Sequence, residues 1–102
     1  MKKYKLLKSD TKVFSGNKLY RIKAEVSFGG VEKGEKGGYI EKEENLSQHG
    51  NAWVSGNARV CDNARVSDDA WVYGDARVYD NAWVYGNAKV SGNAKVFGCA
   101  GS

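Results

Sequence analysis

The feature that most constrains this chain is a six-residue unit, repeated eight times without interruption from Asn51 to Gly98. Every unit has Ala at its second position and Val at its fourth, with Asn or Asp first and Gly or Asp last. Such regularity at a short fixed period predicts a solenoid, in which each repeat stacks on its neighbours. The units read, in order, NAWVSG, NARVCD, NARVSD, DAWVYG, DARVYD, NAWVYG, NAKVSG and NAKVFG.

The alternation within each unit predicts a short strand followed by a corner. Side chains two residues apart point to the same side of a strand, so Ala and Val should face inward and the residues between them outward. The Gly or Asp that ends a unit suits a sharp corner, because these residues adopt positive φ at low cost. We expect every Ala and Val from Ala52 to Val96 inside the coil. The same rule places outside Trp53, Arg59, Arg65, Trp71, Arg77, Trp83, Lys89 and Lys95.

The residues that precede the repeats resemble those of a known family. The string FGGVEKG, which begins at Phe28, and the run GGYIEKEENLSQHGNAWV over residues 37–54 are similar to the amino-terminal part of YdcK-like hexapeptide-repeat proteins of bacteria and phages. With the repeats, this resemblance extends over most of the chain. It implies an all-β, left-handed β-helix in which three units form one triangular turn. The handedness comes from the resemblance alone, and the family brings no established activity.

The amino-terminal part is predicted to form a cap on the solenoid. We expect a β-strand cap over residues 1–44 and the repeat solenoid over residues 45–102. Lys12–Ser15 and Lys18–Phe28 should pair as a β-hairpin, and the apolar face of the second strand should cover the end of the first coil. The glycines within residues 29–38 should form turns, because neither a helix nor a Gly-Lys-Ser/Thr motif follows them.

The net charge of +4 is concentrated at the amino end, where residues 1–23 hold eight Lys or Arg and one acid, Asp10. This surplus could bind nucleic acid or an acidic protein, or its lysines could keep an exposed strand edge from aggregating. No apolar run is long enough to span a membrane or to act as a signal peptide, so we expect a cytoplasmic protein without membrane contact. The two cysteines have no metal-binding spacing, and no cofactor is expected.

The outward positions indicate contact with a partner. Residues i and i+18 should lie one above the other, which forms columns of aromatic and basic side chains. These residue types dominate protein interfaces, although such columns also stiffen a sheet. Arg59, Arg77 and Lys95 oppose like charges, which water, corner aspartates or an anionic partner could relieve. The predicted partner-binding residues are Trp53, Trp71, Tyr73, Arg59, Arg77, Tyr79, Arg65, Trp83 and Tyr85.

The sequence offers little support for catalysis. Enzymes that resemble this fold, many of them acyltransferases, use a histidine in a cleft between solenoids and a loop that projects from one coil. The repeats here contain neither, and the single histidine, His49, has no Cys, Ser or acid at an informative spacing. Asp62 and Asp80 should meet at a corner, where hydrogen bonding explains them better than calcium does. We predict no catalytic residue and no metal site, with an acyltransferase-like enzyme as the remaining alternative.

The last coil is predicted to join two copies of the chain. Only CAGS follows the last unit, so we expect unpaired strand edges there, and two such ends meeting head to head would form a closed homodimer. We interpret the protein as a non-catalytic macromolecule-binding module, such as a phage-encoded inhibitor or accessory factor, with a protein as its partner. A self-assembling structural solenoid is the alternative. The predicted dimer interface contains Val90, Ala94, Val96, Phe97 and Cys99.

Overall fold

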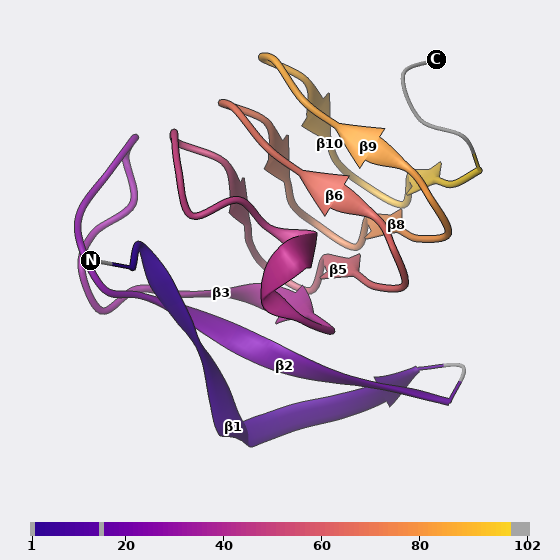
Figure 1. The fold of residues 1–102 in the computed structure, drawn as a ribbon, viewed down its shortest axis with the longest axis horizontal. Helices are drawn as coiled ribbons and strands as arrows, with labels where there is room; N and C mark the ends of the chain where they lie inside the picture. The colour runs from indigo at the N-terminus through magenta and orange to yellow at the C-terminus, as the bar shows by residue number, and fades with distance from the viewer. Residues whose placement is uncertain (1, 15, 99–102) are drawn as a thin grey trace.

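A computed structural model describes residues 2–14 and 16–98, and it shows an all-β protein in which a β-hairpin precedes a β-solenoid (Figure 1). The strands of the repeats contain two residues each. The elements are β1 (Tyr4–Phe14), β2 (Asn17–Ala24), β3 (Lys36–Ile40), the 3-10 turn η1 (Glu43–Asn45), β4 (Trp53–Val54), β5 (Arg59–Val60), β6 (Arg65–Val66), β7 (Trp71–Val72), β8 (Arg77–Val78), β9 (Trp83–Val84), β10 (Lys89–Val90) and β11 (Lys95–Val96).

The eight short strands of the repeats lie on three sheets, one on each side of the coil. β4, β7 and β10 form the first sheet, β6 and β9 form the second, and β5, β8 and β11 belong to the third. All of these strands pair in parallel, with Val60 opposite Val78 and Val78 opposite Val96. The predicted β-helix, with three units in each turn and residues i and i+18 stacked, is therefore confirmed.

The corners of the coil have the geometry that the sequence predicts. The residue at the sixth position of every unit has a φ between 58° and 82°, and this holds for Asp62, Asp68 and Asp80 as well as for the glycines. The backbone N–H of the Ala that follows donates to the carbonyl of the fifth residue, as Ala58 does to Ser55 at 3.2 Å. A left-handed residue and one hydrogen bond thus close each corner.

The inward Ala and Val side chains form the core of the solenoid. From Ala52 to Val84 they are at most 4% exposed. In the last two units Val90 and Val96 are only half-buried, and the two alanines are exposed. The prediction that these positions are enclosed up to Val96 is wrong for these two units, because no described residue stacks on the last coil.

The hairpin extends one sheet of the solenoid. β2 pairs antiparallel with β3, and β3 pairs parallel with β5, so the sheet has the order β1-β2-β3-β5-β8-β11 (Figure 1). The predicted hairpin is present, but β1 is longer than expected and contains a register shift between Leu7 and Thr11. β2 ends at Ala24, short of the predicted Phe28, because Phe28 pairs with Val31 in a separate turn.

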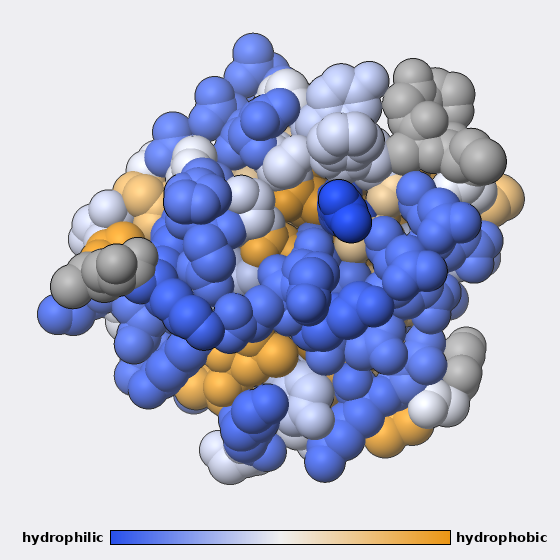
Figure 2. All heavy atoms as spheres, in the orientation of Figure 1, coloured by the Kyte–Doolittle hydropathy of each residue, from blue (hydrophilic) through white to orange (hydrophobic). Residues whose placement is uncertain are grey.

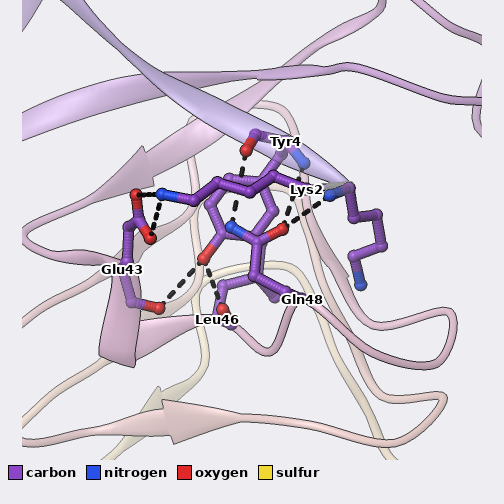
Figure 3. Close-up of polar contacts among 6 residues, drawn as sticks. Lys2, Tyr4, Glu43, Leu46 and Gln48 are labelled. Atoms are coloured by element: carbon purple, nitrogen blue, oxygen red, sulfur yellow. Dashed lines mark hydrogen bonds and ion pairs between the residues drawn. The ribbon is translucent and has the colours of Figure 1, made fainter.

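The start of β1 closes the amino end of the core (Figure 3). Tyr4 is fully buried, and its hydroxyl donates to the Leu46 carbonyl and lies 2.9 Å from the Glu43 carbonyl. The Gln48 side-chain oxygen accepts the backbone N–H groups of Lys3 and Tyr4 at 2.7 and 3.2 Å. Lys2 forms an ion pair with Glu43 at 2.7 Å. These contacts join the first residues of the chain to the irregular coil around η1.

A buried lysine completes the cap. The Lys3 ammonium donates to the Ala52 carbonyl at 2.7 Å, lies 3.4 Å from the Gly50 carbonyl, and sits 4.7 Å from the centre of the Phe28 ring. Burial lowers the pKa of Lys3 to about 8. At the edge of the first coil, a neighbouring strand would normally donate hydrogen bonds to the exposed backbone carbonyls, and here the Lys3 ammonium donates instead. The cap therefore satisfies backbone carbonyls and also covers apolar side chains.

Gly37 and Gly38 lie in β3 and allow this strand to pack on the first coil, so the prediction that they form turns is wrong. A Cβ atom at Gly37 would lie 2.4 Å from the Val54 carbonyl oxygen, and one at Gly38 would lie 2.6 Å from that of Ala58. Real side chains do not approach backbone oxygens this closely. The earlier glycines of the connecting loop include Gly34, which takes a positive φ in a turn, as predicted.

Candidate interaction surfaces

The predicted partner-binding side chains lie on all three sides of the coil, and they are not equally accessible. Figure 2 shows that the face in view is mainly hydrophilic, with several separate hydrophobic patches. Trp53 is fully buried, because the rings of Tyr4 and Phe28 pack edge-on against it at centroid distances of 6.4 and 5.3 Å. The prediction that Trp53 binds a partner is therefore wrong: amino-terminal residues cover it.

The side formed by β4, β7 and β10 retains one exposed ring below the covered Trp53. Trp71 is half-buried, and Tyr73 is 37% exposed. These residues line a shallow hollow together with Asp69 and Lys89, which carry opposite charges. This side therefore has no excess charge of one sign and only a small aromatic surface.

The side formed by β5, β8 and β11 carries the most distinctive surface of the molecule. The hairpin curls back over it, so that the end of the hairpin becomes one wall and the outward side chains of the three strands become the floor. We call this hollow of about 480 Å³ the basic groove. The lining side chains are Phe14, Asn17, Leu19, Arg59, Cys61, Asp62, Arg77, Tyr79 and Lys95.

The cations of the basic groove lack carboxylate partners. The two ion pairs formed within residues 2–14 and 16–98 are Lys2–Glu43 and Arg21–Asp10, so neither involves the groove. The Arg59 guanidinium stacks on the Phe14 ring at 3.4 Å, an arrangement that leaves its in-plane N–H groups free to donate. Burial, and then the neighbouring Arg77, lower the pKa of Arg59. The column of like charges foreseen from the sequence is thus present and is not neutralised by direct contacts.

Asp62 holds the end of the hairpin against the coil. Its Oδ1 accepts the Asn17 side-chain amide at 2.9 Å, and its Oδ2 accepts the Asp80 backbone N–H at 3.1 Å. The bond to Oδ2 joins two corners of the coil, as the sequence indicated, whereas the bond to Oδ1 links the coil to the hairpin and was not predicted. The neighbouring Cys61 is half-buried, and burial together with Asp62 raises the pKa of its thiol to about 11. Cys61 is consequently protonated near neutral pH and is a poor nucleophile.

The side formed by β6 and β9 presents a fixed aromatic pair. Trp83 is 49% exposed and Tyr85 is 44% exposed, and their rings lie 5.2 Å apart with a tilt of 51°. The Trp83 indole N–H donates to the Ser67 hydroxyl at 2.8 Å, which fixes the ring against the sheet. Arg65 is exposed beside them and shares a hollow of about 450 Å³ with Lys42. These residues lie where the sequence places them, and their contact with a partner stays a prediction.

The carboxy-terminal coil ends in three edge strands, β9, β10 and β11. We call this surface the open end. Val90 and Val96 are half-buried there, Ala94 is exposed, and Phe97 is 59% exposed while it stacks on Tyr79 at 5.3 Å. Four of the five predicted dimer residues therefore gather on one surface. The fifth, Cys99, lies outside the described residues.

The amino-terminal cations are partly engaged within the chain. Lys8 and Lys18 lie over the Tyr20 ring at 4.4 and 5.7 Å, and Lys12 lies over Tyr39 at 5.0 Å. These contacts cover aromatic faces along the hairpin with charged groups, which suits the role of protecting an edge strand. Binding of nucleic acid by this end remains the alternative that the charge distribution suggests.

His49 is exposed, and its described contacts involve only its backbone, which exchanges hydrogen bonds with the Ser47 hydroxyl at 3.0 and 3.1 Å. The absence of catalysis stays a prediction. Within residues 2–14 and 16–98, no group of three or more His, Cys, Asp or Glu side chains is arranged to hold a metal ion. The same residues contain no helix of the length and apolar character needed to cross a bilayer.

Comparison with known proteins agrees with the resemblance noted in the sequence. The YdcK beta solenoid repeat family matches three overlapping segments, residues 58–74, 70–86 and 76–92. No curated protein matches the chain. The matched segments include the strands from β5 to β10, which form the three-sided coil that carries most of the floor of the basic groove. The coils of this protein over residues 58–92, about one third of the chain, are therefore similar to the YdcK beta solenoid repeat.

Proposed function

We propose that this protein is a non-catalytic macromolecule-binding module that acts as a homodimer joined through the open end. The observation that carries the proposal is the difference between the two ends of the solenoid. At the amino end, β3, Leu46 and the Lys3 ammonium each contact an edge of the first complete coil. At the other end, among residues 2–14 and 16–98, the last strand of every sheet is an edge, with partly exposed Val90 and Val96.

A second copy of the chain is the occupant that fits the open end best. Two identical ends related by a twofold axis bring apolar Val onto apolar Val and place edge strands side by side, and the contact closes after two copies. Phe97 lies at the margin of this surface, where an aromatic side chain adds contact area. Contact between unlike ends is blocked by the hairpin, which disfavours the alternative of an open fibre.

The size of the open end sets the expected affinity. A six-residue side of the coil is about 20 Å long, so the end of the triangular coil with its side chains covers on the order of 400 Å². This is about half of what one partner buries in a standard interface. We therefore expect a dissociation constant in the micromolar range, which makes dimer formation concentration-dependent.

The surfaces described above favour binding over catalysis. The basic groove contains one thiol, that of Cys61, and its pKa of about 11 keeps it protonated. His49 belongs to the irregular coil that precedes β4 and does not line the groove. A nucleophile and a general base within hydrogen-bonding reach, which covalent catalysis needs, are therefore not brought together by these residues.

Light scattering coupled to size-exclusion chromatography tests the dimer. We expect the mass to rise from that of one chain to that of two between about 1 and 100 µM, as a micromolar dissociation constant requires. Val96→Lys places a charge at the open end and should give a monomer throughout this range. Val13→Lys is the matched control, because Val13 is 67% exposed on the hairpin, and it should dimerise as the unmodified protein does. A monomer at 100 µM without any substitution would refute the proposal.

The partner that we propose for the module is another protein, bound through Trp83, Tyr85 and the cations of the coil. A phage-encoded inhibitor or accessory factor working in the cytoplasm is the biological setting that we infer from the family resemblance. The site is supported if a protein partner binds the Trp83→Ala variant more weakly than the unmodified protein, while circular dichroism shows that the fold of the variant is unchanged. An affinity that Trp83→Ala leaves unchanged would refute this site.

A further inference from the structure

We propose that the basic groove is a binding site for a phosphate-bearing ligand, held chiefly by Arg59 and Arg77. The inference rests on the proposed role as a binding module and names the chemistry that one of its surfaces recognises. The wall and the floor of the groove come from distant parts of the chain, because Phe14 belongs to the hairpin and Arg59 to the first coil.

A bound anion would relieve the repulsion between the positive charges of the groove. Arg59 lies directly opposite Arg77, and Arg77 directly opposite Lys95, in the register of the parallel sheet. Neighbouring strands are about 4.8 Å apart, so the three cationic residues are attached along about 10 Å of the sheet. The single lining carboxylate, that of Asp62, already accepts two hydrogen bonds from Asn17 and Asp80. A compact ligand with two or more negative charges would replace the mutual repulsion by attraction.

The wall of the groove prepares one of these cations for binding. Stacking on Phe14 fixes the plane of the Arg59 guanidinium and leaves its N–H groups pointing along that plane. A guanidinium held in one orientation loses little conformational entropy when it binds, and its fork of N–H groups matches two oxygens of one phosphate group. The Asn17–Asp62 hydrogen bond keeps the wall in place.

Size and shape favour a small or linear phosphate compound over a folded acidic protein. The groove measures about 480 Å³, within the range of small-molecule sites, and the hairpin wall restricts access to its floor. A phosphate group concentrates its charge on oxygens that share one centre, whereas carboxylates of a peptide are spread along its length. The same phosphate chemistry could come from a free nucleotide or from the backbone of single-stranded nucleic acid, whose bases could also stack on exposed rings such as Phe97.

Calorimetry with inorganic pyrophosphate at low ionic strength tests the site. We expect saturable binding that weakens as salt is added, because charge–charge attraction provides most of the affinity. Arg77→Gln removes one exposed cation and should weaken binding roughly tenfold, the loss expected for one charge-assisted hydrogen bond. Arg65→Gln is the matched control, since Arg65 holds the same position of the repeat unit on another side of the coil, and its affinity should stay within about twofold.

Two further probes identify the source of the phosphate. The first probe is a single-stranded oligonucleotide of ten thymidines. If it binds more tightly than pyrophosphate and its affinity depends on Arg77 in the same way, the groove is assigned to nucleic acid. Tighter binding of pyrophosphate would assign it to a nucleotide-like molecule. The proposal is overturned if pyrophosphate does not bind saturably, if Arg65→Gln weakens binding as much as Arg77→Gln, or if a poly-glutamate peptide of equal charge binds more tightly than either phosphate compound.

The outcome for the groove is separable from the outcome for the dimer. Calorimetry reports the groove and light scattering reports the open end, and Arg77 is not an open-end residue. A monomeric protein that binds pyrophosphate would overturn the dimer alone. A dimeric protein without affinity for any of the probes would overturn the phosphate site alone.

Discussion

The burial of Trp53 gives the sharpest test of how the cap and the coils depend on each other. Replacing Trp53 by Ala removes an indole that is fully buried and that packs against the rings of Tyr4 and Phe28. Burying about 200 Å² of aromatic surface at about 25 cal/mol/Å² corresponds to roughly 5 kcal/mol, of which Ala retains a small part. The indole N–H has no hydrogen-bond partner among the described residues, so its removal leaves none of their acceptors unsatisfied. We expect Trp53→Ala to lower the free energy of unfolding by about 4 kcal/mol.

The repeat provides an internal control for this substitution. Trp83 occupies the same position in a unit that also begins NAWV, but it is 49% exposed. Trp83→Ala should therefore cost about 1 kcal/mol or less. The assay is urea denaturation followed by circular dichroism, because each substitution also removes a fluorophore. Making both substitutions in the Val96→Lys background keeps association through the open end from contributing.

The result that would refute this reasoning is a small difference between the two variants. If Trp53→Ala and Trp83→Ala lower the free energy of unfolding by amounts within about 1 kcal/mol of each other, amino-terminal residues do not pack on the first coil as described. A large effect of Trp53→Ala would show that the cap belongs to the same cooperative unit as the repeats, since the indole links the first coil to rings that lie far from it in the sequence.

Two further predictions concern the same end of the coil. The pKa of Lys3, near 8 in the folded protein, lies below its ordinary value of 10.5, so the unfolded chain binds more protons between these values and stability rises with pH in this window. Between about pH 7 and 9.5, the free energy of unfolding should therefore rise by about 2 kcal/mol more in the unmodified protein than in the Lys3→Met variant. Equal rises in the two proteins would contradict the burial of the ammonium. Gly50→Ala should lower the melting temperature more than Gly86→Ala. Both glycines have positive φ, but only at Gly50 would an added Cβ lie close to a backbone atom, 2.6 Å from the Asp68 carbonyl oxygen. Equal melting temperatures of the two variants would contradict the stacking of these corners.

The local features of the coil could be predicted because they depend on a few neighbouring residues. Alternation of Ala and Val assigns the inner face, and Gly or Asp at the sixth position assigns the corner, without knowledge of any distant contact. A solenoid follows from repeating this unit, whereas the β-helix with three units in each turn, and with it the i to i+18 register, was implied by the family resemblance. What the repeat leaves open is which outward residue is covered. Trp53 and Trp83 share the segment NAWV, and the position of Tyr4 and Phe28 in the fold explains why one is covered and the other is exposed.

Of the two surfaces that form the basic groove, the floor could be predicted from the sequence and the wall could not. Its floor, with Arg59 and Arg77 in one column, follows from the repeat. Its wall depends on how far β1 and β2 continue beyond β3 and on how strongly they curl, which are properties of sheet twist that no short pattern encodes. The sequence contains one faint sign of the wall, because Leu19 is apolar but alternates out of phase with Ile22. Leu19 is fully buried as part of this wall.

The parallel register has a consequence for how chains of this kind can change in length. An insertion of eighteen residues, three units, would add one complete turn and keep every outward column on its own side. An insertion of six residues would move all later units by one side, so that an arginine aligned with Arg59 would leave its column and an indole would replace it. Duplication of whole turns could therefore extend the basic groove by about 4.8 Å and one cation at a time, while the cap at the other end is unaffected.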